Sequence, residues 1–303
     1  GRDFWVAAKA WSERLSGKQE NEGVYFGTQN TLIPRVEEPD MDKLEKDIGY
    51  VDTLVGNLSV PVYLGLIPSA AEIWRDRLPK GAPTADEKSA IDRLYFATGA
   101  ETVDLYSALD AHRQEDIYYR TDHHWTSLGA FYGANALFES MGLEPLALEE
   151  FSKTTVTDQF YGTSFSISGV RWLPPDSIDR YVSGEGVSVT TYFAGKAEEG
   201  SLYVDSCLEN KDKYAYFLGG NQPLCVIRTR QAGGPRVLLV RDSYSDSLAP
   251  FLTERFSEIH LFDLRYNLNS VSQYVEDNEI DAVVVLYSFA NFAQDRSLSL
   301  LTR

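Results

Sequence analysis

Hydrophobic residues recur along this chain with two different spacings, which predict alternating helices and strands. Apolar residues at helical spacing predict helices over 41–58, 126–141, 248–256 and 271–278. Short continuous apolar runs predict buried strands at 60–67, 237–240, 259–264 and 282–287. Strands that alternate with helices are typical of a mainly parallel sheet with right-handed crossovers. The pattern therefore predicts a single α/β domain over residues 1–303.

Residues 150–230 differ from this α/β pattern. Thr, Ser, Tyr and Gly dominate there, and polar and apolar residues alternate in patches such as 188–193 and 214–217. A period of two is typical of strands with one exposed face. We therefore expect a β-rich insertion at about 150–230 within the α/β domain.

Four shorter elements are predicted in the first third of the chain. Helical spacing predicts a helix over 3–15, and two short apolar runs around a turn predict a hairpin over 24–34. Thr84, followed three residues later by Glu87, fits a capping box at the start of a further helix. The run from 101 to 109 predicts another strand.

The net charge of −17, from 45 acidic and 28 basic residues, limits the possible partners. Phosphate backbones are bound by clustered Lys and Arg, so nucleic acid is excluded as a partner. Charge repulsion also makes a polyanionic glycan an unfavourable substrate. No apolar run reaches the roughly 20 residues that a membrane span needs. The sequence opens at Gly1 inside a predicted helix, so a leader or anchor that precedes it remains open.

Cys207 and Cys225 are the only cysteines. An oxidising compartment would favour a disulfide between them, and two buried thiols are the alternative. Their spacing does not resemble a CxxC metal or redox site.

Two segments contain residue types that serve catalysis. The first, 118–126, places Asp122, His123 and His124 at the start of a predicted helix. The second places Ser243 just after the strand 237–240, and ligands gather at the carboxyl ends of strands in open α/β sheets. A serine hydroxyl needs a base within hydrogen-bond reach and a third group that orients the base. Asp122, His124 and Ser243 supply these three groups, and backbone N–H groups of the helix after Ser243 could stabilise an oxyanion.

Each of these residues also has a structural interpretation. Ser243 could cap the following helix, the histidines could lie in a surface loop, and Asp122 or Thr126 could cap the helix that begins there. A zinc site at Asp122, His123 and His124 is disfavoured, because adjacent ligands rarely converge on one ion and the helical i, i+4 histidine spacing is missing. We therefore predict no metal and no cofactor, and the two segments together favour a triad.

The sequence Asp122-His123-His124-Trp125 resembles the signature of the DHHW proteins of Gram-positive bacteria. These are similar to the alginate O-acetylation proteins, whose SGNH-hydrolase-like domain carries Asp-x-His-Trp and a later Asp-Ser-Tyr-Ser, found here at 242–245. The resemblance implies an SGNH-hydrolase-like mainly parallel sheet flanked by helices. It also implies that Asp122 orients the base, that His124 is the base and that Ser243 is the nucleophile.

Five further residues are expected near the substrate. Arg241 stands where a glycine often precedes Asp-Ser in the family, so it would alter the oxyanion hole or bring a positive charge to the substrate. Gly220 and Asn221 are candidate oxyanion donors by residue type, although Gly-Gly-Asn also suits a tight turn. Tyr119 is expected to line the substrate groove, and His123 is expected either to line it or to pack beside it.

The function that the resemblance implies is transfer of an acetyl group, through Ser243, to a hydroxyl of an exopolysaccharide or cell-wall glycan. Family members work outside the membrane, commonly beside a membrane-bound acyltransferase, so an extracellular, surface-associated or anchored location is expected. The acidic charge favours a neutral or amino-sugar glycan. A carbohydrate acetylesterase with the same triad and a non-catalytic glycan-binding scaffold are the alternatives.

Overall fold

The computed structural model describes residues 5, 11, 12 and 17–303. The helix predicted over 3–15 lies almost entirely outside these residues. No helix in the described part of the chain is both long enough and apolar enough to cross a membrane.

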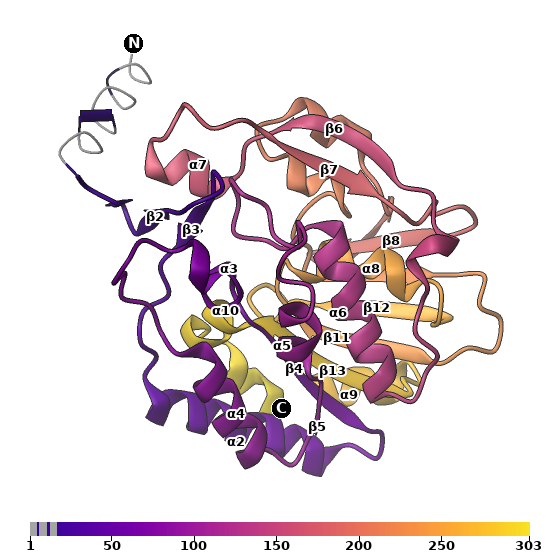
Figure 1. The fold of residues 1–303 in the computed structure, drawn as a ribbon. Coiled ribbons are helices and arrows are strands. Elements are labelled where there is room, and N and C mark those ends of the chain that lie inside the picture. The colour runs from indigo at the N-terminus through magenta and orange to yellow at the C-terminus, as the bar shows by residue number, and fades with distance from the viewer. Residues whose placement is uncertain (1–4, 6–10, 13–16) are drawn as a thin grey trace.

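An eight-stranded sheet forms the centre of the molecule (Figure 1). Its strands, in spatial order, are β5 (Glu101–Thr102), β4 (Val62–Ile67), β13 (Ala282–Ser288), β11 (Arg236–Arg241), β12 (Glu258–Phe262), β10 (Leu224–Arg228), β8 (Ser188–Phe193) and β9 (Lys196–Gly200). The first five are parallel to their neighbours, and the last three are added antiparallel. The predicted mainly parallel α/β sheet is confirmed.

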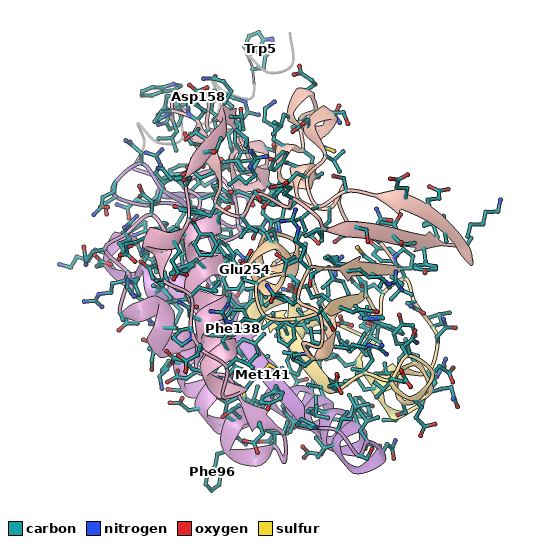
Figure 2. All side chains as sticks on the ribbon, turned by 90° about the vertical axis from the view of Figure 1, so that its right-hand side faces the viewer. Trp5, Phe96, Phe138, Met141, Asp158 and Glu254 are labelled. Carbon is teal, nitrogen blue, oxygen red and sulfur yellow. The ribbon has the colours of Figure 1, made fainter. Side chains whose placement is uncertain are left out.

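Helices flank this sheet, and their apolar stripes face it. They are α2 (Met41–Asn57), α3 (Ala70–Ile73), α4 (Glu87–Ala97), α5 (Leu105–Asp110), α6 (Ser127–Ser140), α8 (Ser245–Leu252), α9 (Val271–Asp277) and α10 (Phe289–Gln294). In α6, Phe131, Leu137 and Phe138 are buried. Phe96 of α4, by contrast, is 95% exposed and projects from the surface (Figure 2).

The segment 150–230 is rich in strands, but it does not form one separate unit. β6 (Thr154–Phe160) and β7 (Asp176–Arg180) make a two-stranded sheet of their own, whereas β8, β9 and β10 extend the central sheet. The helix α7 (Thr163–Ser168) and short 3₁₀ turns at Asp205–Glu209 and Lys213–Tyr216 interrupt the strands. Part of the expected insertion is thus the antiparallel edge of the main sheet.

The predicted hairpin is present as β2 (Val24–Phe26) and β3 (Leu32–Pro34), with β1 (Glu20–Asn21) beside β2. The predicted capping box at Thr84 and the predicted strand over 101–109 are not found as expected. The capping box at Thr84 does not form, because Asp86 caps α4 by accepting from the backbone N–H of Ser89. Glu87 is instead fully buried and accepts a hydrogen bond from the backbone N–H of Ser69.

The strand predicted over 101–109 is also wrong beyond its first two residues. Asp104 accepts a hydrogen bond from the backbone N–H of Ser107 and so begins the helix α5. Leu105 and Leu109, four residues apart, are the buried residues of that helix. An N-cap thus decided between two periods that a short apolar run cannot distinguish.

The two cysteines are free thiols. Cys225 is buried in β10, and burial raises its pKa to about 12. The disulfide alternative is therefore not realised in this structure.

Candidate active site

The turn that carries Ser243 connects the carboxyl end of β11 to α8. The buried carboxylate of Asp242 holds this turn in place. It accepts from the backbone N–H of Tyr244 at 3.1 Å, from the backbone N–H and hydroxyl of Ser288 at 2.9 and 2.8 Å, and from Nδ2 of Asn291 at 2.7 Å. Since Ser288 ends β13, Asp242 connects the turn that carries Ser243 to the carboxyl ends of two adjacent parallel strands.

The segment 118–126 forms a tight loop before α6. Tyr118 and Trp125 make an isolated antiparallel bridge, and Thr126 caps α6. The loop is anchored to β7 because Asp176 accepts from the backbone N–H of Thr121 at 2.8 Å and from its hydroxyl at 2.6 Å. The indole Nε1 of Trp125 donates to the backbone carbonyl of Tyr244 at 3.0 Å. This hydrogen bond joins the loop to the turn that carries Ser243.

The structure brings Asp122, His124 and Ser243 together, although 119 positions separate the last two. Nε2 of His124 lies 2.8 Å from Oγ of Ser243, and Nδ1 lies 2.6 Å from Oδ1 of Asp122. The second carboxylate oxygen of Asp122 accepts from the backbone N–H of Thr163 at 2.7 Å, at the start of α7. Gly162 leaves no room for a Cβ beside this carboxylate. The predicted convergence of the three residues is thus confirmed.

The electrostatics favour an ionised Asp122. Burial by itself would raise the pKa of this carboxyl group, but the adjacent imidazoles of His124 and His123, together with the hydrogen bonds just described, lower its pKa well below the usual range. Desolvation and the neighbouring His124 lower the pKa of His123 to about 4, so His123 is neutral at pH 7.

Tyr214 belongs to the site and was missed by sequence reasoning. Its ring stacks on the ring of His124, with centroids 3.8 Å apart and planes inclined by 10°. Its hydroxyl lies 3.0 Å from the backbone carbonyl of Ser243 and 3.0 Å from Oγ of Ser247. The Tyr214 side chain therefore contacts both His124 and the turn that carries Ser243. The sequence pattern at 214–217, which includes this tyrosine, predicted only a strand.

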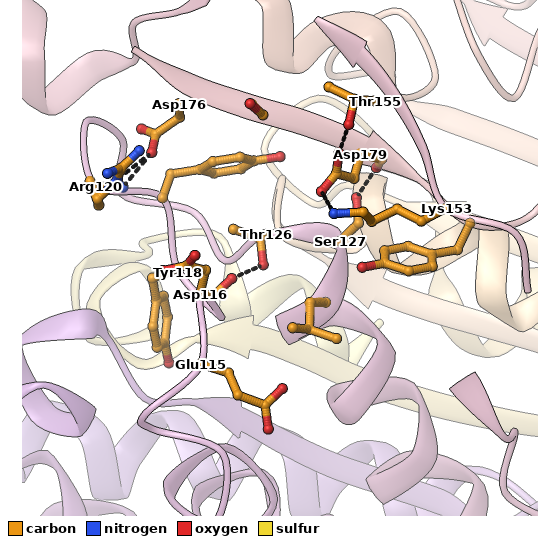
Figure 3. Close-up of a pocket in the computed structure, with 14 residues that line it drawn as sticks. Glu115, Asp116, Tyr118, Arg120, Thr126, Ser127, Lys153, Thr155, Asp176 and Asp179 are labelled. Carbon is orange, nitrogen blue, oxygen red and sulfur yellow. Dashed lines mark hydrogen bonds and ion pairs between the residues drawn. The ribbon is translucent and has the colours of Figure 1, made fainter. Parts of the chain in front are cut away.

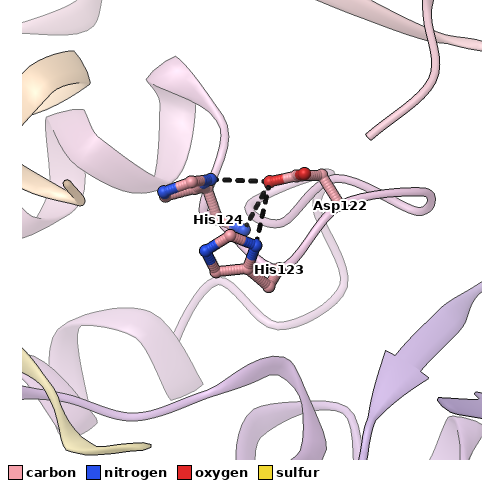
Figure 4. Close-up of side chains that lie close together, drawn as sticks. All are labelled: Asp122, His123 and His124. Carbon is pink, nitrogen blue, oxygen red and sulfur yellow. Dashed lines mark hydrogen bonds and ion pairs between the residues drawn. The ribbon is translucent and has the colours of Figure 1, made fainter. Parts of the chain in front are cut away.

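His123 hydrogen-bonds the first residue of α7, and no hydrogen bond joins it to Ser243 in the described part of the chain. Its Nδ1 lies 2.7 Å from the hydroxyl of Thr163 and 3.6 Å from Asp122 (Figure 4). Ligand atoms of Asp122, His123 and His124 lie within 4.8 Å of one another, the spacing a metal site would need. Both ring nitrogens of His124, however, are engaged by Asp122 and Ser243, so an ion would have to break the triad.

Comparison with known proteins gives the family. A family model described as DHHW protein matches residues 44–262, a range that contains both segments of the site. This chain belongs to the DHHW family.

Solved structures show the same fold. A DHHW family protein from Eubacterium siraeum superposes with a TM-score of 0.81 at 24% identity, covering 93% of this chain and 95% of that one. Bacillus cereus PatB1, solved with a sulfonyl adduct, gives 0.74 at 19% identity, with coverage of 90% and 95%. The O-acetyltransferase domain of Pseudomonas putida AlgJ gives 0.57 at 17% identity, with coverage of 91% and 94%. A search of curated protein sequences found no match.

Arg241 of this DHHW protein cannot face a substrate as expected, because its side chain is fully buried. Its guanidinium forms an ion pair with the buried Asp246 of α8, at 2.9 Å. The hydrogen bond from its Nη1 to Oδ1 of Asn221, at 3.4 Å, draws that side chain toward Arg241. Gly220 has a φ of +93°, which matches the tight-turn alternative for Gly-Gly-Asn.

The backbone N–H of Ser243 and the side chain of Tyr119 differ in their access to the substrate. The backbone N–H of Ser243 has no acceptor among the described residues, so it is available to a developing oxyanion. Tyr119, expected in the substrate groove, is 2% exposed and packs behind Tyr214, with ring centroids 6.4 Å apart. Tyr119 therefore does not contact Ser243 but lines a different pocket, described below.

Proposed function

We propose that this DHHW protein is a serine-dependent O-acetyltransferase that acetylates a glycan through an acetyl-Ser243 intermediate. The observation that carries the proposal is the unbroken hydrogen-bonded chain from Asp122 through His124 to Ser243. The fold shared with the O-acetyltransferase domain of AlgJ supports it.

In the first step, Oγ of Ser243 attacks the carbonyl carbon of an acetyl ester while Nε2 of His124 accepts the hydroxyl proton. The free N–H of Ser243 would stabilise the oxyanion. The tetrahedral intermediate collapses, the bond to the donor alcohol breaks, and His124 returns the proton to that alcohol. Asp122 stays ionised throughout and holds the imidazole in the tautomer whose Nε2 accepts the proton.

In the second step, a sugar hydroxyl attacks the acetyl-Ser243 ester. His124 takes the proton of that hydroxyl and then returns it to Oγ as the serine leaves. Water in place of the sugar would give an acetylesterase. We place the reaction outside the cytoplasmic membrane, on an exopolysaccharide or cell-wall glycan, with a membrane-bound acyltransferase as donor partner. Membership of the DHHW family supports this placement.

An activated acetyl ester tests the proposal. The wild-type protein is expected to release a burst of leaving group and to gain an acetyl mass on the Ser243 peptide. Ser243→Ala is expected to lose both, with the acylation rate lowered roughly a thousandfold or more. Ser245→Ala is the matched control, because its hydroxyl lies in the same motif but has no hydrogen-bond partner among the described residues. It is expected to retain the adduct.

Oligosaccharide separates the transferase from its alternatives. Faster clearance of acetyl-Ser243 with a glycan than with water alone is expected for a transferase. Equal rates would indicate an acetylesterase. A folded protein that forms no adduct with several donors would favour a glycan-binding scaffold and would contradict the proposal.

A further inference from the structure

A pocket of about 500 Å³ lies beside the loop 118–126, which carries Asp122 and His124 (Figure 3). We call it the β6–β7 pocket. Its walls are residues 115–120, the start of α6, and the residues of β6 and β7 that face them. None of the three triad residues lines it.

Tyr119 gives the first reason to expect a ligand. Its hydroxyl is buried and has no hydrogen-bond partner in the described part of the chain. A buried hydroxyl without a partner destabilises the fold, because its hydrogen bonds to water are lost and not replaced. Burial raises the pKa of Tyr119 well above its usual value, and Asp176, Asp179 and Tyr181, which line the same pocket, raise it further. A ligand with a polar atom in this pocket would supply the missing partner.

The charges of the pocket select against an anion. Both of its cationic side chains are already paired, Arg120 with Asp176 at 3.2 Å and Lys153 with Asp179 at 3.5 Å. The carboxylate of Asp116 has no ion-pair partner among the described residues. The excess of carboxylates would repel a phosphate or an acidic sugar and attract an ammonium group.

The remaining lining groups suit the hydroxyls of a sugar, each of which can both donate and accept a hydrogen bond. Carboxylates accept, and the backbone N–H groups of Ser127 and Leu128, in the first turn of α6, have no acceptor in the described chain. The half-buried Tyr181 adds an aromatic ring to the wall. Rings together with a few convergent polar groups are typical of small-molecule sites.

We propose that the β6–β7 pocket is a binding subsite for an uncharged or amino-sugar unit of a glycan, separate from the catalytic centre. It shares a wall with the triad, because the loop 118–126 borders the pocket and also carries Asp122 and His124. Tyr119 contacts Tyr214, whose ring stacks on His124. The inference rests on the proposed function only in taking the bound glycan to be the acetyl acceptor.

Binding is measured on the full chain carrying Ser243→Ala, so that no acyl transfer contributes. The probes are short oligomers of glucose, N-acetylglucosamine, glucosamine and galacturonate, titrated while NMR or calorimetry records the dissociation constant. The first three are expected to bind, and galacturonate oligomers are not. Binding of the galacturonate oligomer alone, or of none of the four, would overturn the inference.

Two added substitutions locate the subsite. Tyr119→Phe removes only the unpartnered hydroxyl, so it is expected to weaken binding about tenfold while the melting temperature stays unchanged or rises. Asp116→Asn is expected to weaken binding of the glucosamine oligomer more than that of the N-acetylated one. Asp158→Asn is the matched control, an exposed β6 carboxylate outside the pocket (Figure 2). It is expected to change neither.

Other outcomes of this experiment are equally decisive. Unchanged binding in both pocket variants, or a lowered melting temperature for Tyr119→Phe, would refute the subsite. Binding with the expected pattern in a protein that never forms acetyl-Ser243 would uphold the subsite and refute the acetyltransferase. The reverse result would uphold the acetyltransferase and refute the subsite.

Discussion

Replacing Tyr214 with Phe tests whether the stacked ring also positions the nucleophile. The change keeps the ring on His124 but removes a hydroxyl that lies 3.0 Å from both the backbone carbonyl of Ser243 and Oγ of Ser247. Ser247 keeps its contact with Nε1 of Trp125, also at 3.0 Å. The carbonyl of Ser243 keeps its hydrogen bond from the backbone N–H of Asp246, at 3.2 Å, but loses the one from Tyr214.

The size of the effect follows from these two contacts. A typical intramolecular hydrogen bond contributes about 0.5–1.5 kcal/mol, so Tyr214→Phe is expected to lower the free energy of unfolding by about 1–3 kcal/mol. If about 1–2 kcal/mol of this also positions Oγ of Ser243 for attack, the acylation rate is expected to fall about 5–30-fold. Tyr214→Leu removes the stacking as well, and we expect a larger loss of both.

The assay compares acylation rates, from the burst with an activated acetyl ester, with unfolding free energies from urea titration. Tyr203→Phe is the control, since its hydroxyl donates to the backbone carbonyl of Val182 at 2.7 Å within the same aromatic cluster. This variant is expected to lose about 0.5–1.5 kcal/mol of stability and less than half of its rate. Full activity in a destabilised Tyr214→Phe protein would refute the positioning role and leave Tyr214 purely structural.

Three further outcomes are expected. His124→Ala should abolish acylation, whereas His123→Ala should retain measurable activity, because His123 contacts Thr163 and not Ser243; equal losses in burst assays would contradict this. Burial raises the pKa of Glu87 to about 7, above its unfolded value, so the free energy of unfolding should fall as pH rises from about 4.5 to 7. In urea titrations, Glu87→Gln should therefore be more stable than wild type at pH 8, by up to roughly 3 kcal/mol, but not at pH 5. An equal difference between the two proteins at both pH values would argue against this. Iodoacetamide should label the half-buried Cys207 before the buried Cys225 in the folded protein, and labelling at equal rates, seen by peptide mass analysis, would contradict the described burial.

The sequence by itself determined the α/β architecture and indicated the three residues that meet in the candidate active site. Short apolar runs such as 237–240 and 282–287, which alternate with helical patterns, predicted buried strands and so the parallel centre of the sheet. The residue types indicated Ser243 and the segment of Asp122, His123 and His124, because a serine after a buried strand and a histidine beside a carboxylate have few other joint uses. The resemblance to the DHHW signature then assigned His124, and not His123, as the base.

Local signals were less reliable where two interpretations shared one pattern. The short run after Glu101 became a helix once Asp104 capped it, and Thr84 lost the cap of α4 to Asp86. Such competitions are decided by single hydrogen bonds whose strength depends on what the rest of the fold buries. Glu87 is an example, since its side chain turns toward Ser69 and not back along its own helix.

Only the tertiary structure decided what surrounds the triad. Tyr214 reaches His124 from a 3₁₀ turn 90 residues away. Arg241 turns inward to Asp246, although it stands only two positions before Ser243. The unpartnered hydroxyl of Tyr119 emerged only when β6 and β7 closed a pocket against its loop. Stacking, ion pairing and burial arise between segments that are distant in the chain, and no periodicity within one segment records them.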